Sequence, residues 1–102
     1  MVIYTVTTMN KLPSIKSYEP YDCRCVGWFQ EFDHADRAVR HNYGDIYEIG
    51  SYPYAIIEKI DEGFYGTHPR DRTLYEFNRK TEMYEPIPEP ETLKHLCGFG
   101  IG

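Results

Sequence analysis

The stretch Tyr54-Ala55-Ile56-Ile57-Glu58-Lys59-Ile60 decides how this chain folds. It is rich in β-branched residues, which favour strands. Its apolar residues occupy positions of both parities, so the two faces of the strand should both be largely covered. The stretch therefore predicts a central strand, and a sheet is expected to form on both sides of it.

Four further segments have the composition of strands: Val2–Thr8, Cys23–Phe29, Thr73–Asn78 and Glu82–Ile87. Gly27, inside the second of these, indicates a bulge or a close backbone approach. The last two segments flank Arg79-Lys80-Thr81 and are predicted to form a hairpin. Pro86 and Pro88 place its second arm at an edge, because proline cannot donate to a sheet ladder.

Two short helices are expected. The first follows Asp33 as N-cap and ends near Gly44. Its buried stripe, at helical spacing, is Ala35, Ala38, Val39 and Asn42. The second covers Pro90–Cys97, while residues 45–50 form either a short strand or an irregular passage. The sequence thus predicts one α+β domain over residues 1–102, with a mainly antiparallel sheet of about five strands, one helix packed on a face and a short C-terminal helix.

Composition excludes several classes of function. The chain has a net charge of −5, which argues against binding to a nucleic-acid polymer. It contains no run of 18 apolar residues and its first ten residues lack a signal-peptide core, so we expect no membrane partner and a cytoplasmic location. Three cysteines are an odd number, which argues against a disulfide framework.

Cys23 and Cys25, joined by His95 and Cys97, could in principle provide four zinc ligands. The first two cysteines are closer in sequence than in usual zinc knuckles, and the last two residues point apart on a helix. Buried, inert cysteines are the alternative. No phosphate-binding glycine motif or catalytic signature occurs. We therefore predict no catalytic residue, no metal and no cofactor.

Arginines and aromatic rings offer a better candidate for function. Arginine forks suit phosphates, and neighbouring rings can stack a base. Tyr75 and Phe77 share one face of a strand that follows a loop with arginines. The predicted ligand-binding residues are Arg24, Trp28, Arg70, Arg72, Tyr75 and Phe77. The alternative is that these arginines lie at the surface and pair with the many carboxylates of the chain.

Several short motifs also carry a resemblance. They are Val26-Gly27-Trp28-Phe29, the helix end Ala38-Val39 with Asn42, Gly44-Asp45-Ile46-Tyr47-Glu48, Tyr54-Ala55-Ile56-Ile57-Glu58, Tyr84-Glu85-Pro86-Ile87, Leu93-Lys94-His95 and Cys97-Gly98-Phe99-Gly100-Ile101-Gly102. On these motifs, which cover most of the chain, the sequence resembles a group of short uncharacterised proteins of Firmicutes and of their phages and prophages. In size, acidity and aromatic content it is also similar to phage sponges that capture nucleotide signals of Thoeris or CBASS immunity.

This likeness implies a phage-encoded, non-enzymatic protein that sequesters a nucleotide-derived immune signal in the host cytosol. The expected partner is a small anionic nucleotide-like ligand. A homo-oligomer is expected as well, because small domains often build deep pockets where subunits meet. The alternative function is a protein–protein interaction inhibitor or adaptor that uses an aromatic-rich surface.

Overall fold

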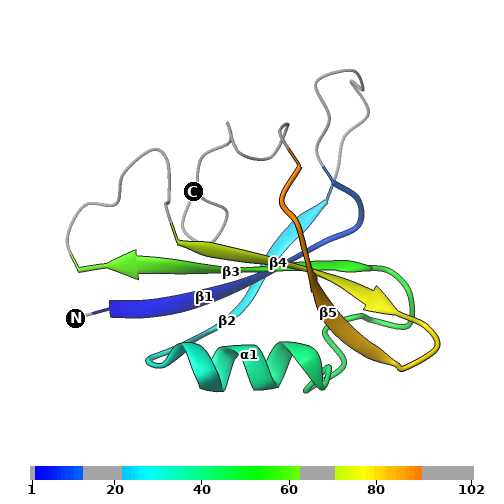
Figure 1. Cartoon of the computed structure of the whole chain (residues 1–102), viewed down its shortest axis with the longest axis horizontal. Helices are drawn as coiled ribbons and strands as arrows, with labels where there is room; N and C mark the ends of the chain where they lie inside the picture. The colour runs from blue at the N-terminus through cyan, green and yellow to red at the C-terminus, as the bar shows by residue number, and fades with distance from the viewer. Residues whose placement is uncertain (1, 13–21, 63–70, 91–102) are drawn as a thin grey trace.

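The computed structural model describes residues 2–12, 22–62 and 71–90. These residues form a five-stranded, fully antiparallel sheet with a helix on one face (Figure 1). The elements are β1 (Val2–Met9), β2 (Cys23–Phe29), α1 (Phe32–Arg40), β3 (Tyr54–Asp61), β4 (Arg72–Asn78) and β5 (Met83–Ile87). The strand order is β2-β1-β3-β4-β5, so β2 and β5 are the two edges. The α+β class and the five-stranded antiparallel sheet are confirmed.

The strand predictions agree with the structure to within a residue or so at each end. β3 is the central strand, and Ala55, Ile56 and Ile57 are all buried. β5 is an edge strand, as Pro86 indicated. The register between β1 and β2 shifts beside Gly27, where Val26 has no partner on β1. This shift is the bulge that the glycine indicated.

The helix begins two residues earlier than predicted. Glu31 is the N-cap, and its side chain makes no capping hydrogen bond. Asp33 is therefore not the cap. It lies in the first turn, where its carboxylate interacts favourably with the positive end of the helix dipole. Ala35 and Val39 are buried against the sheet, whereas Ala38 and Asn42 are half-buried. The buried stripe is narrower than predicted, and Asn42 lies beyond the helix, which ends at Arg40.

The sheet carries one apolar cluster on each face. On the helix face, the buried members are Val6, Ala35, Val39, Ala55, Ile57, Tyr75 and Tyr84. On the opposite face, which we call the far face, Met9, Ile56 and Leu74 form a smaller cluster. Neighbouring residues of β3 and β4 alternate between the two clusters, as strand geometry requires. On these strands, an odd or even residue number thus decides on which face of the sheet the side chain lies.

Two predictions fall on residues outside the described ranges: the second helix over Pro90–Cys97 and the loop that carries His68 and Arg70. Between α1 and β3, residues 45–50 are a succession of turns rather than a strand. Within the described part of the chain, no helix is long and apolar enough to span a membrane.

Candidate functional site

The predicted site residues Tyr75 and Phe77 share the helix face of β4, as expected; Tyr75 belongs to the core, and the half-buried Phe77 packs against it. Tyr75 is fully buried, and its hydroxyl donates a hydrogen bond of 2.5 Å to Asp36 Oδ1 on α1. Burial, followed by this hydrogen bond, raises the pKa of Tyr75 far above its ordinary value. Phe77 stacks on Tyr47, with ring centroids 3.8 Å apart. Tyr75 thus joins the helix to the sheet and presents no surface to a ligand.

Arg72 lies on the other face of β4. Its guanidinium is 3.8 Å from Glu58 Oε2 and 2.5 Å from Glu89 Oε1. The side chains of Arg72 and Glu58 are 4% and 0% exposed, so both charges are buried together. A buried arginine between two carboxylates is the expected partner of those carboxylates. Arg72 therefore has a structural role, as the partner of Glu58 and Glu89.

Arg24 and Trp28 lie on β2, on opposite faces of the sheet. Arg24 pairs with Thr8, on the helix face, and its Nη1 is 3.0 Å from Glu48 Oε2. Trp28 pairs with Thr5, on the far face, and is 59% exposed. The five described members of the predicted site therefore do not meet in one pocket. Arg70 falls outside the described residues.

A different set of cations has no side-chain partner among the described residues. Among residues 2–12, 22–62 and 71–90, the basic side chains that pair with a carboxylate include Arg24, Arg40, Lys59 and Arg72. Arg37 on α1 and the adjacent Arg79 and Lys80 make no side-chain hydrogen bond or ion pair in this part of the chain. In a chain of net charge −5, the Arg79-Lys80 dipeptide without a partner in the described residues is more unusual than the single Arg37.

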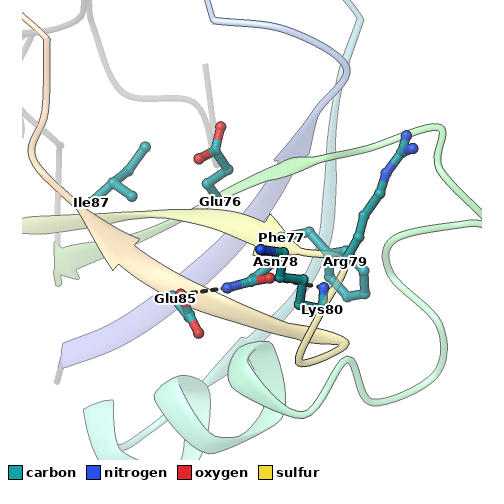
Figure 2. Close-up of a pocket in the computed structure, with 7 residues that line it drawn as sticks. All are labelled: Glu76, Phe77, Asn78, Arg79, Lys80, Glu85 and Ile87. Atoms are coloured by element: carbon teal, nitrogen blue, oxygen red, sulfur yellow. Dashed lines mark hydrogen bonds between the residues drawn. The ribbon is translucent and has the colours of Figure 1, made fainter.

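Arg79 and Lys80 lie in the turn between β4 and β5. The side chain of Asn78 organises this turn: its Oδ1 accepts the Lys80 N–H, and its amide donates to Glu85 Oε2. Glu82 closes the turn with φ 58° and donates its N–H to the Asn78 carbonyl. Figure 2 shows Arg79 extending away from the body of the hairpin. The turn thus holds an arginine outward on a hydrogen-bonded base.

Arg79 borders two neighbouring hollows. The larger, of about 720 Å³, lies open to solvent between the α1–β3 loop and the β4–β5 turn, and we call it the loop–hairpin hollow. It is lined by His41, Asn42, Tyr47, Ile49, Gly50, Phe77, Arg79 and Glu82. The smaller hollow, of about 440 Å³, lies over the hairpin itself and adds Lys80 (Figure 2). The larger volume is within the usual range for small-molecule sites.

The wall that faces the hairpin is an unusual loop. Asn42, Gly44, Asp45, Glu48, Ile49 and Gly50 all have positive φ. The side-chain oxygen of Asn42 accepts the Tyr47 N–H at 2.9 Å, which closes the loop. Ile49 is the strained member, because a β-branched side chain rarely adopts φ of 53°. Its side chain is nevertheless 92% exposed, so no packing within the described residues accounts for this strain.

The chemistry available in the loop–hairpin hollow is that of binding. Arg79 offers a planar fork for a phosphate or carboxylate, and Asn42 and His41 add polar groups beside it. Phe77 and Tyr47 provide a ring surface. Glu82 is the acidic residue in the lining and favours ligands that also carry a hydrogen-bond donor. An anionic molecule with a ring matches this combination.

Among the described residues, the cysteines do not form a metal site or an activated nucleophile. Cys23 and Cys25 both lie exposed on the far face of β2, opposite Met9 and Thr7. Partial burial and the nearby Asp22 carboxylate raise the pKa of the Cys23 thiol, which lowers its nucleophilicity. The described residues contain no group of three potential metal ligands. His95 and Cys97 fall outside these residues.

Sequence reasoning missed Arg79, Tyr47, Ile49 and the part of His41 in the hollow. A signal for Arg79 was present, since Arg79-Lys80 is a basic pair in a turn of an acidic chain. No comparable local signal marked the opposite wall, which is contributed by residues about thirty positions earlier. The chain matches no protein-family model, no curated protein and no solved structure.

Proposed function

We propose that this protein is a non-enzymatic binding protein that sequesters a small, anionic, ring-bearing ligand in the loop–hairpin hollow. The observation that supports this most is Arg79, which has no partner in the described part of the chain and lies at the rim of a hollow that contains aromatic rings. Carboxylates are plentiful in this chain, and Arg24, Arg40 and Arg72 each pair with one. An arginine held away from them is available to an anion from solution.

A nucleotide-derived molecule is the ligand class that fits best. Its phosphates would receive charge-assisted hydrogen bonds from Arg79, with Lys80 close by in sequence on the same turn. Its base would lie against the exposed edge of the Tyr47–Phe77 pair. Both rings are half-buried and held by the core, so they form a rigid surface that costs little entropy to use. Of the six residues predicted from the sequence, the site proposed here keeps Phe77.

The biological setting of this proposal follows from the resemblance described above. A phage-encoded sponge of the bacterial cytosol would bind an immune signal tightly and release it unaltered. Such a protein would need no catalytic group, and its effect would depend on affinity and on its abundance relative to the signal. Cyclic oligonucleotides and cyclic isomers of ADP-ribose are the signals to test first.

The test is calorimetry with cyclic dinucleotides, cyclic trinucleotides, ADP-ribose and its cyclic isomers. We expect one of them to bind, and Arg79→Ala to weaken its affinity by about 10- to 100-fold, the value of a charged hydrogen bond. Arg37→Ala is the matched control, because Arg37 is also exposed and unpaired but does not line the hollow. Equal binding by Arg79→Ala and the parent would refute this site, and a ligand recovered in altered form would refute sequestration.

A second candidate function is inhibition of a protein partner. The observation that favours it is Ile49, whose apolar side chain is held in solvent on a strained backbone. Tyr43, in the same loop, is 56% exposed. Exposed apolar residues of this kind are typical of interface centres. If no nucleotide binds, and a partner captured by the parent is not captured by Ile49→Asn, this second function would replace the first.

A further inference from the structure

The two edges of the sheet differ in how they are protected against further strand pairing. β5 carries Pro86 and the acidic Glu85, and proline and charge are the usual means of blocking an edge. β2 carries neither proline nor lysine, and its one charged residue is Arg24. Its single protective feature is the bulge at Val26. β2 is therefore the edge at which another strand can add.

The outer side of β2 has no hydrogen-bond partner among residues 2–12, 22–62 and 71–90. The side chains along it have the composition of an interface rather than of a solvated edge. Trp28 is 59% exposed, and Cys23 and Cys25 are exposed thiols. Tryptophan is enriched at interfaces and charge is depleted there. An open strand with this composition serves as a template for assembly.

Local charge allows two copies to approach through β2 despite the net charge of −5 on each. Arg24 is neutralised by Glu48 of its own chain, at 3.0 Å. The one charge within Cys23–Phe29 is therefore compensated, so the strand itself brings no net charge to the contact. An edge in this state favours a second copy of the same chain over a partner selected by charge.

The bulge restricts the register that such a pair can adopt. Arg24 and Phe29 lie on the helix face, opposite Thr8 and Tyr4, whereas Cys25 and Trp28 lie on the far face. Directly opposed residues of antiparallel strands share a face. A two-fold axis that passes between Val26 and Gly27 satisfies this rule along the whole strand. It places Arg24 opposite Phe29 of the second copy, and Cys25 opposite Trp28 of the second copy.

We propose that the protein forms a two-fold dimer in which the β2 strands of two copies pair in this register and join the two sheets into one. None of the residues that line the loop–hairpin hollow lies on β2, so the dimer leaves this hollow open in each copy. The inference is therefore independent of the proposed ligand, and each can fail without the other.

The first experiment is sedimentation equilibrium of the full chain over a wide concentration range. We expect a dimer, and a dissociation constant raised by about tenfold or more in Trp28→Lys and in Cys25→Lys, because a central interface tryptophan is a typical hot spot. Both residues are exposed, and thermal unfolding checks that each variant is folded. Tyr43→Lys is the matched control at 56% exposure, and it should dimerise like the parent. A parent that remains monomeric, or a dimer unaffected by both β2 variants, would overturn the proposal.

A second experiment tests the register. Trp28→Cys, made in a background of Cys23→Ser and Cys97→Ser, leaves Cys25 and the new thiol as the cysteines of the chain. In the proposed register they face each other twice across the two-fold axis, at a separation that a disulfide can bridge. Mild oxidation should then convert the dimer into a covalent one, whereas Tyr43→Cys in the same background should not cross-link. A dimer of the Trp28→Cys variant that stays uncross-linked would overturn this register.

Discussion

Two arginines bracket β4, and their surroundings are opposite. Arg72, at the start of the strand, is 4% exposed and lies between Glu58 and Glu89. Arg79, one residue past the end, is exposed and extends from the hairpin turn without a partner among the described residues (Figure 2). The same residue type thus stabilises the folded state at one end of the strand, as Arg72, and is available for binding at the other end, as Arg79. In an acidic protein, the informative arginine is the one that the carboxylates leave unpaired.

The largest effect that follows from this comparison is expected at Arg72. Arg72→Ala leaves Glu58, which is fully buried, without its cation, and we expect a loss of about 3–5 kcal/mol in the free energy of unfolding. Urea denaturation measures this loss. The double variant Arg72→Met with Glu58→Leu removes both charges and should recover most of the stability. A loss below about 1 kcal/mol for Arg72→Ala would contradict a structural role.

The next effect concerns the tyrosines between these ends. Burial raises the pKa of Tyr75 and of Tyr84 well above the ordinary value of 10.0. The unfolded chain ionises these groups near pH 10, whereas the folded protein keeps them neutral. Their contribution is therefore complete below pH 10 and is lost above it, by about 1.4 kcal/mol per pH unit for each tyrosine.

Denaturation midpoints measured between pH 8 and pH 11 test this expectation. Tyr75→Phe should be less stable than the parent at pH 8, because the hydrogen bond to Asp36 is lost. Its stability should then fall less steeply with pH, since one buried hydroxyl has been removed. Identical slopes for the parent and Tyr75→Phe would show that Tyr75 does not contribute to the alkaline transition.

A smaller effect, of opposite sign, is expected in the loop. Ile49→Asn should raise the free energy of unfolding by up to about 1 kcal/mol, because asparagine tolerates positive φ and a β-branched residue does not. Thermal unfolding measures the gain. Ile49→Val keeps the branch at Cβ and should give no gain. A destabilised Ile49→Asn would mean that the isoleucine contributes packing that its 92% exposure does not suggest.

The smallest effect on stability is expected at Arg79. Arg79→Ala should change the free energy of unfolding by less than about 0.5 kcal/mol, as for exposed residues without partners. Measured beside Arg72→Ala in the same denaturant series, it completes the comparison of the two ends of β4. A loss of several kcal/mol at Arg79 would show that the turn depends on the guanidinium, and the binding test would then need a conservative variant.

The sequence was sufficient for the strands because their signals are local. The runs at Tyr54–Asp61 and Cys23–Phe29 contain the β-branched and aromatic residues that fill a pleated surface, and Gly27 marked the bulge. The helix start was missed by two residues because Glu31 acts as the cap without a side-chain hydrogen bond. No propensity scale anticipates such a position.

Arg72 and Tyr75, both predicted for one site, lie apart for a reason that the sequence did contain. Arg72 and Tyr75 are three residues apart on one strand, so their side chains lie on opposite faces. Proximity along the chain was given more weight than parity. The loop–hairpin hollow, in contrast, depends on Tyr47 stacking on Phe77, a contact between segments thirty residues apart. Only the tertiary structure brings these segments together.

The position of β1 has a consequence for synthesis. β1 lies between β2 and β3 in the sheet, yet Thr5 pairs with Glu58, which the ribosome adds 53 residues later. At about 5–20 residues per second, the β1 edge that will receive β3 stays open for roughly 3–10 s after it is made. β4 and β5 are joined by a tight turn and can pair almost as soon as they emerge. The half of the sheet that is synthesised first is therefore the half that is completed later.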